Sequence, residues 1–217
     1  MAAVENEKRM IRARHVPFWV GFVRLMYKSL FRIFFREVTI VGELKTEDKS
    51  VLLLGNHFSW WDGFFADHVN ALLFRKNLHI MMLEDQLKPR MFLNKAGAFS
   101  IQPGGRGIAT SLAYAAEVLQ KKDSFLVMYP QGKIESDKQS PLVFQPGLMR
   151  IIEKTEGNFQ FVFLVALVDY FSHACPSARL YLKEYHYEAG QDIRTIENHY
   201  NAFFRECVLE QNNLSHG

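Results

Sequence analysis

Cysteine is scarce in this chain, and its two thiols stand far apart. Cys175 and Cys207 are the only cysteines among 217 residues, and neither belongs to a spacing typical of a metal site. The sequence therefore does not indicate the disulfide framework that stabilises small secreted domains. We expect a reduced cytosolic setting with two inert thiols.

A long uninterrupted apolar run is also missing near the N-terminus. The apolar stretch 16–23 is short, Arg24 interrupts it and no small-residue cleavage site follows, which argues against a secretory signal peptide. Internal repeats, low-complexity tracts and long linkers are absent as well. At this length one domain with a full hydrophobic core is the simplest arrangement. We expect it over residues 37–217, preceded by a membrane-associating helical segment over residues 1–36.

Positive charge is concentrated at the N-terminus. Residues 1–36 hold eight Lys and Arg against two Glu, a balance of +6. The whole chain carries only +3, so residues 37–217 are net acidic at −3. This distribution indicates an anionic surface as the partner. We expect membrane lipids and no nucleic acid.

Residues 17–36 form a predicted basic amphipathic helix. Pro17 suits its first turn, and cations recur every four residues, so they span about 120° of the helix surface. Aromatic and aliphatic side chains fill most of the remaining surface, and four mid-helix charges would be costly inside a bilayer. We expect the helix to lie in the membrane interface, with contacts from Trp19, Phe22, Arg24, Lys28, Arg32 and Arg36. The alternative is a helix packed on the domain with a solvated basic stripe.

Short apolar runs alternate with helical patterns over the rest of the chain. Strands are predicted at 38–41, 51–54, 80–83, 98–101, 125–129, 159–168 and 179–187. Helices are predicted at 64–74, 86–95, 108–120, 146–154 and 192–211. Strands that alternate with helices predict an α/β fold with a largely parallel central sheet flanked by helices.

The run 56–62 holds the strongest candidate for a catalytic pair. His57 and Asp62 stand five apart, directly after the apolar strand predicted at 51–54. Ligands of open α/β sheets bind beyond the carboxyl ends of the strands, where a turn can bring a general base and its orienting carboxylate together. The competing interpretation is a capping box, with Ser59 at the helix N-cap, Asp62 satisfying backbone donors and His57 hydrogen-bonded locally.

A family resemblance rests on this run and on blocks that follow it. The segment Asn56-His57-Phe58-Ser59-Trp60-Trp61-Asp62 resembles the Asn-His-x-Ser-x-x-Asp signature of the glycerophospholipid acyltransferases of the lysophosphatidic-acid type. Residues 97–101, 129–133, 144–147 and 163–167 are similar to later blocks of that family, in the same order. The resemblance covers roughly residues 35–170 and is most specific in the first block.

The resemblance implies transfer of an acyl chain from a thioester, with acyl-CoA or acyl carrier protein (acyl-ACP) as co-substrate and no metal or other cofactor. Neutral His57 would take the proton from an acceptor hydroxyl or amine, which attacks the thioester directly. Asp62 would hold the imidazole tautomer and stabilise the imidazolium. No covalent acyl-enzyme is needed, and the chain has no Gly-x-Ser-x-Gly elbow. Backbone amides in the turn after His57 are candidate oxyanion donors.

The second and third blocks depart from the family pattern. The third block is typically Glu-Gly-Thr-Arg and here reads Gln131-Gly132-Lys133-Ile134, so an amide replaces the acid. Pro103 stands where the second block usually ends in an arginine that holds the acceptor phosphate. Arg106, in a glycine-rich turn before a helix, is the expected replacement, unless it is merely solvated. Substrate contacts are therefore predicted at Asn56, Ser59, Arg106, Gln131, Gly132 and Lys133.

We therefore expect a lipid acyltransferase that is peripheral to the membrane, at its cytoplasmic face. A lysophospholipid is the expected acceptor, followed by an aminolipid or glycosylated lipid. The altered third block makes acyl transfer better supported than phosphate-specific recognition of the acceptor. The alternatives are a non-catalytic lipid-binding relative and an acyl-thioester hydrolase.

Overall fold

One seven-stranded sheet organises the molecule. The computed structural model describes residues 10–102, 104–136, 140–155 and 157–214, so Lys8, Arg9 and Pro103 lie outside the described residues. The strand order is β1-β7-β6-β2-β5-β3-β4. The strands are β1 Glu37–Val41, β2 Val51–Gly55, β3 Asn77–Leu83, β4 Ala98–Ile101, β5 Ser124–Met128, β6 Gln160–Asp169 and β7 Ser177–Glu184.

The sheet is largely parallel, as predicted. Every neighbouring pair is parallel except β6 and β7. Strand β2 lies between β6 and β5, with Gly55 opposite Leu164 and Leu54 opposite Met128. All five of its residues are buried, which explains why it is an unbroken apolar run in the sequence. The carboxyl end of β2, where the run 56–62 begins, is therefore near the middle of the sheet edge.

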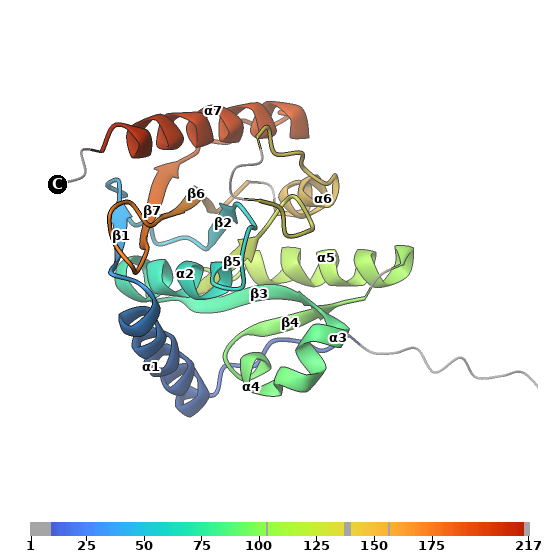
Figure 1. Cartoon of the computed structure of the whole chain (residues 1–217). Helices are drawn as coiled ribbons and strands as arrows, with labels where there is room; N and C mark the ends of the chain where they lie inside the picture. The colour runs from blue at the N-terminus through green and yellow to red at the C-terminus, as the bar shows by residue number, and fades with distance from the viewer. Residues whose placement is uncertain (1–9, 103, 137–139, 156, 215–217) are drawn as a thin grey trace, which may run out of the picture.

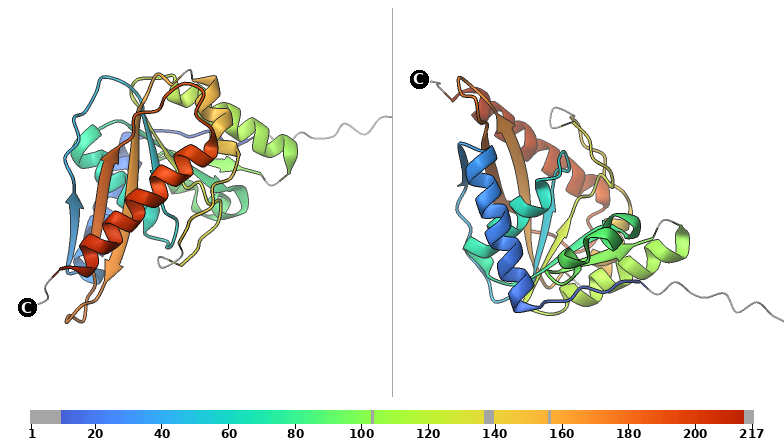
Figure 2. Two further views of the ribbon diagram at one scale, coloured as in Figure 1. Left: turned by 90° about the horizontal axis from the view of Figure 1, so that it is seen from above. Right: turned by 60° about the horizontal axis from the view of Figure 1, so that its bottom comes forward.

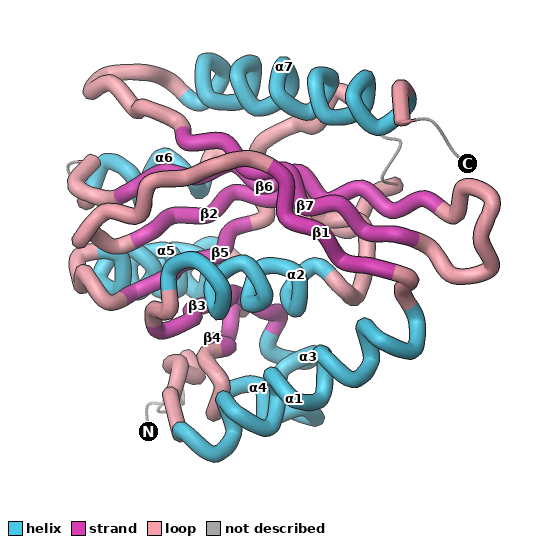
Figure 3. Tube along the Cα trace, turned by 90° about the vertical axis from the view of Figure 1, so that its left-hand side faces the viewer, coloured by secondary structure: helices cyan, strands magenta, loops and turns pink. Residues whose placement is uncertain are grey.

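Helices cover both faces of the sheet. They are α1 Pro17–Phe34, α2 Asp62–Val69, η1 Asn70–Phe74, α3 Glu84–Leu87, η2 Lys88–Arg90, α4 Met91–Asn94, α5 Gly105–Leu119, α6 Gly147–Lys154 and α7 Ile193–Asn212. Buried side chains of α5, α6 and α7 pack with Leu52 and Leu54 of β2, and those of α1 and α2 pack with Val51 and Leu53. Helices α7 and α1 thus lie on opposite sides of the sheet (Figures 1 and 3), and α7 runs along β6 and β7 (Figure 2).

The predicted strands and helices are present, with ends shifted by a few residues. The prediction of one continuous helix over 86–95 is wrong. The helix predicted at 64–74 is α2 continued by η1. The segment predicted as one helix over 86–95 is instead divided among α3, η2 and α4. Pro89 lies within η2, and proline lacks the amide proton and clashes with the preceding turn, so it interrupts a regular α-helix.

The N-terminal segment is packed on the domain. The Ile11 amide donates to the Ser100 hydroxyl (2.8 Å), and the Ser100 amide donates to the Ile11 carbonyl (2.9 Å). Helix α1 then buries Val23, Tyr27 and Phe31 in the same cluster as β2. No helix in the described ranges combines the length and apolar character needed to cross a bilayer.

Candidate active site

The turn between β2 and α2 brings His57 and Asp62 together. The Nδ1 atom of His57 lies 2.7 Å from Oδ2 of Asp62. The Asp62 side chain is 2% exposed, whereas that of His57 is 26% exposed. Because Nδ1 is occupied by the carboxylate, Nε2 is the ring nitrogen left to accept a proton. A buried carboxylate that orients a partly exposed imidazole is the arrangement that a general base needs.

The predicted capping box is only partly present in the same turn, because α2 begins at Asp62 with Trp61 as its N-cap, so Ser59 is not the N-cap residue. The Trp61 amide donates to the Ser59 hydroxyl oxygen (3.1 Å), and the Ser59 amide donates to Oδ2 of Asp62 (3.0 Å). The Ser59 hydroxyl also donates to Oδ1 of Asp62 (2.7 Å). Ser59 as helix N-cap is therefore wrong, whereas the expectation that Asp62 satisfies backbone donors is confirmed at Phe58 and Ser59. These bonds fix the carboxylate that contacts the imidazole.

The backbone amides of this turn are already bonded within the protein. The His57 amide donates to Oε1 of Gln131 (2.7 Å), and the Phe58 amide donates to Oδ2 of Asp62 (2.8 Å). The Ser59 and Trp61 amides are bonded to side chains of the same turn. The expectation that the turn supplies oxyanion donors is thus wrong for these four amides.

Asn56 joins the end of β2 to β6. Its Nδ2 donates to the Ala166 carbonyl (2.9 Å), and its Oδ1 accepts from the Ala166 amide (2.8 Å). These bonds extend the β2–β6 pairing beyond Gly55, the last residue in register. Asn56 is buried and both ends of its amide are used, so its role in the structure is to hold the turn that carries His57.

The third block bonds to His57 from the opposite side of the turn. Gln131 is buried, and besides accepting from the His57 amide it donates through Nε2 to Oε2 of Glu135 (2.9 Å). The Glu135 amide donates to the His57 carbonyl (2.9 Å), and Lys133 forms an ion pair with Glu135 (2.9 Å). Gly132 has φ of 71°, a conformation that favours glycine. Glu135 was missed in the sequence, although it stands only four residues after Gln131.

Tyr129, like Glu135, belongs to this site but was not predicted from the sequence. Its ring stacks on the His57 imidazole, with centroids 4.5 Å apart and planes at 16°. Its hydroxyl is buried and has no hydrogen-bond partner among the described residues. Burial raises the pKa of this phenol well above its usual value, and the negative charge of Asp62 adds to the effect. The Tyr129 phenol is therefore neutral beside His57 and Asp62.

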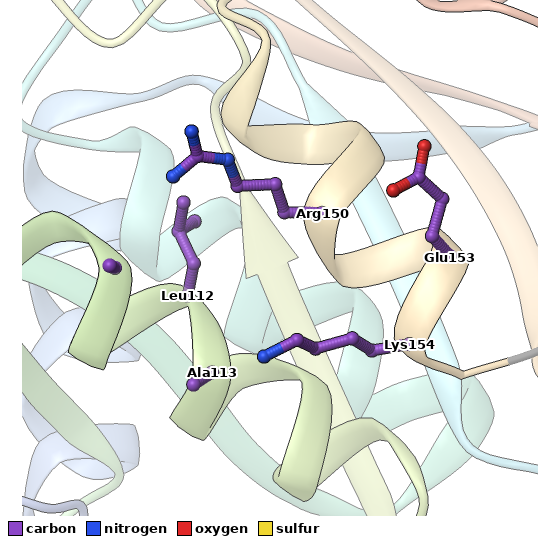
Figure 4. Close-up of a pocket in the computed structure, with 6 residues that line it drawn as sticks. Leu112, Ala113, Arg150, Glu153 and Lys154 are labelled. Carbon is purple, nitrogen blue, oxygen red and sulfur yellow. The ribbon is translucent and has the colours of Figure 1, made fainter.

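Arg106 is not brought together with His57. It is exposed in the first turn of α5 and lines a cavity of about 720 Å³ with Arg12, Gln102 and Tyr114. Neither His57 nor Asp62 lines this cavity. Strand β4, which leads to α5, is three strand spacings from β2, or about 14 Å. A smaller cavity of about 180 Å³ between α5 and α6, into which Arg150 and Lys154 point, also excludes the predicted site residues (Figure 4).

Helix α1 presents an apolar outer face. Phe18, Leu25 and Ile33 are 70%, 68% and 64% exposed, and Phe22 is exposed at 44%. Positions separated by 4, 3 and 8 residues share one side of a helix. The remaining cations of the predicted stripe beside this face, namely Lys28, Arg32 and Arg36, are exposed as well.

Two of the residues predicted to contact a membrane face the protein instead. Arg24 makes a bidentate contact with the buried carboxylate of Asp67 on α2, at 3.1 Å from both Nε and Nη2. Trp19 is half-buried, and the Lys95 ammonium lies 4.8 Å from its ring centroid. Only Phe22, Lys28, Arg32 and Arg36 of that predicted set point outward. The exposed face of α1 also includes Phe18, Leu25 and Ile33, which were not among the residues predicted to contact a membrane.

The same helix contacts the turn between β2 and α2. The Trp61 ring lies 5.9 Å from that of Phe31 and 5.0 Å from that of Phe35, just after the helix. Trp60, next in the turn, is 58% exposed. The exposed Phe34 at the end of α1 also lies 5.7 Å from the Trp61 ring, so exposed apolar surface of the helix reaches the turn that carries His57.

A comparison with protein families matches residues 37–167 to the family described as Acyltransferase. The matched span begins with β1 and contains the His57 turn, the third block and most of β6. The curated proteins give no significant match.

Proposed function

The chain belongs to the acyltransferase family, and on that premise we propose that it moves a fatty acyl chain from acyl-CoA or acyl-ACP to a hydroxyl or amine of a lipid. The observation that supports this most directly is the 2.7 Å contact between His57 Nδ1 and Asp62 Oδ2. Both residues lie within the matched span. A lysophospholipid is the acceptor that we test first.

The proposed reaction is a direct transfer. Nε2 of His57 takes the proton of the acceptor hydroxyl while the oxygen attacks the thioester carbonyl. Asp62 stabilises the imidazolium that forms. The tetrahedral intermediate collapses with cleavage of the carbon–sulfur bond, and the imidazolium returns the proton to the departing thiolate. The products are the acylated lipid and a free thiol, and His57 is neutral again.

The predicted substrate-binding residues divide into two groups by their contacts. Asn56, Ser59 and Gln131 use their polar atoms within the protein, so we assign them to positioning of the site. Lys133 is 71% exposed and Arg106 is exposed, so both can reach a ligand. Lys133 is already paired with Glu135, and Arg106 lines a separate cavity. Their contacts therefore support a phosphate-bearing acceptor less strongly than His57 and Asp62 support acyl transfer.

We also propose that the protein is peripheral to the membrane, at its cytoplasmic face, through the outer face of α1. Exposed apolar side chains next to cations are typical of helices that lie in the interface of anionic membranes. Because α1 also contacts Trp61, this orientation places the catalytic turn close to lipid. A lipid acceptor would then reach His57 without leaving the bilayer surface completely.

The test is product analysis with the purified full chain. The protein is incubated with labelled acyl-CoA or acyl-ACP and vesicles that contain lysophospholipids, aminolipids and glycolipids, and the lipids are analysed by mass spectrometry. Acyl transfer predicts label in a new lipid. Label in free fatty acid alone would instead identify a thioester hydrolase, and no turnover with vesicle binding would identify a non-catalytic lipid-binding protein.

A further inference from the structure

The segment after β5 places one side-chain amide and one carboxylate four residues apart, at Gln131 and Glu135. The family resemblance places an acid at position 131, where this chain has glutamine. Four residues later, Glu135 lies against that glutamine, with Gln131 Nε2 and Glu135 Oε2 2.9 Å apart. The structure thus contains one amide and one carboxylate in direct contact.

The contact is directional. Gln131 uses its carbonyl oxygen to accept from the His57 amide and its NH₂ group to donate to Glu135. A carboxylate at position 131 would still accept from His57, but it has no proton to donate. Two carboxylate oxygens would then face each other in place of the bond between Gln131 and Glu135. Like charges at this distance repel, and one of them would have to take up a proton.

We propose that Gln131 and Glu135 are a matched positioning pair for His57, in which one position must carry an amide and the other a carboxylate. The pair bonds to both polar atoms of the His57 main chain, since Gln131 accepts from its amide and the Glu135 amide donates to its carbonyl. The imidazole is thereby held in line with Asp62. This role rests on the proposed acyl transfer, but the contact itself can be tested without it.

Lys133 supplies the partner of the second carboxylate oxygen of Glu135. Its ammonium lies 2.9 Å from Oε1 of Glu135, the oxygen that Gln131 does not use. Among the described residues, each side-chain polar atom of the pair therefore contacts a partner of opposite hydrogen-bonding character. Exchanging the two residues preserves every one of these partners. A carboxylate at position 131 would accept from the His57 amide and from the side-chain NH₂ group at position 135, whose carbonyl oxygen would face Lys133.

The experiment exchanges the residues at positions 131 and 135. Gln131→Glu, Glu135→Gln and the double variant are compared with the wild type in kcat, KM, pH profile and Tm. Gln86→Glu is the matched control, because it adds the same charge at an exposed residue of α3 whose side-chain oxygen can still accept from Arg90. We expect Gln131→Glu to lower kcat at least about tenfold at pH 8 while KM changes less than about threefold, as loss of an interaction made in the transition state predicts.

The double variant distinguishes a matched pair from a general loss of structure. We expect it to recover kcat to within about threefold of wild type. In Gln131→Glu alone, kcat relative to wild type should rise as the pH falls, because one protonated carboxylate can donate as the amide did. A kcat in Gln131→Glu equal to that of wild type would overturn the proposal. So would a folded double variant no more active than Gln131→Glu.

A stability cycle tests the pair even if the wild type shows no transfer. Gln131→Glu should lower Tm by at least about 4 °C, and the double variant should restore most of that loss. Additive Tm changes in the double variant would overturn the pairing. Absence of turnover by the wild type, with Tm rescue in the double variant, would instead reject only the proposed function.

Discussion

The imidazole of His57 stacks on the ring of Tyr129, with ring centroids 4.5 Å apart and planes 16° from parallel. His57 follows β2 and Tyr129 follows β5, so the stack joins the ends of two neighbouring parallel strands. Asp62 bonds to Nδ1 in the ring plane while Tyr129 covers one ring face. The proposed base is therefore oriented in two independent directions.

Removing the Tyr129 hydroxyl should be harmless, whereas removing the ring should not. The hydroxyl has no partner among the described residues, so Tyr129→Phe keeps the stack and loses no hydrogen bond. We expect its kcat within about threefold of wild type and an unchanged or higher Tm, because an unsatisfied buried polar group is costly. Tyr129→Ala should lower kcat at least about tenfold. Equal activity of the two variants would show that the stack has no role.

Asn56 should contribute strongly to stability. Asn56→Ala leaves the Ala166 amide and carbonyl without their side-chain partner, which costs about 2–4 kcal/mol in the free energy of unfolding. Urea unfolding measures the loss. The control is Asn198→Ala on the exposed side of α7, where a change within about 0.5 kcal/mol is expected. Similar losses for both variants would contradict the role given to Asn56.

The outer face of α1 should bind anionic vesicles. Replacing Lys28, Arg32 and Arg36 together with glutamine should weaken binding to phosphatidylglycerol-containing vesicles at least about tenfold, because each basic residue near such a surface contributes about 1 kcal/mol. Vesicle sedimentation measures the affinity. Arg24 stays unchanged because its partner is Asp67.

The matched control for this variant removes three exposed cations from the other side of the sheet. Lys154, Arg194 and Arg205 lie on α6 and α7 and are exposed, and their glutamine variants should bind vesicles as the wild type does. If the two triple variants lose binding equally, attraction depends on net charge alone, and the α1 face is merely solvated.

His79 should make the protein less stable in acid. Burial lowers the pKa of His79 to about 3, and the positive charges of His15 and Lys121 act in the same direction. Below pH 6.5 the unfolded state binds a proton at this residue that the folded state does not bind. Stability is therefore complete above about pH 6.5 and falls as the pH drops toward 3, with a loss of about 2 kcal/mol at pH 5.

A His79→Phe variant checks this assignment. Its free energy of unfolding should fall less between pH 7 and pH 5 than that of the wild type, whereas the exposed His186→Ala variant should follow the wild type. Urea unfolding at both pH values gives the difference. The same decrease in wild type and His79→Phe would show that His79 does not cause the acid sensitivity.

Local sequence patterns predicted the fold class, because the alternation of apolar strands and amphipathic helices depends on residues that are close in the sequence. They placed β2 and the start of α2 well enough to pair His57 with Asp62. Pro89 marks the interruption within 86–95, but the helical periodicity on both sides of it predicts one continuous helix. Propensity fixes elements more reliably than their ends.

Contacts between distant residues could not be predicted in the same way. The bond between His57 and Gln131 spans 74 positions, and the pair of Arg24 and Asp67 spans 43. The first depends on the pairing of β2 with β5, and the second on how α1 packs against α2. The two faces of α1 are both apolar, so periodicity could not decide which one packs on the domain. The burial of Tyr27 and the exposure of Leu25 decide it.

The most direct test of the central claim is the initial rate of acyl transfer from acyl-CoA or acyl-ACP to lipid by His57→Ala, measured beside wild type and His186→Ala. If His57 is the general base, transfer by His57→Ala falls about 10²–10⁴-fold with Tm close to that of wild type, and His186→Ala keeps the wild-type rate. A folded His57→Ala protein that transfers acyl chains at the wild-type rate would contradict the mechanism.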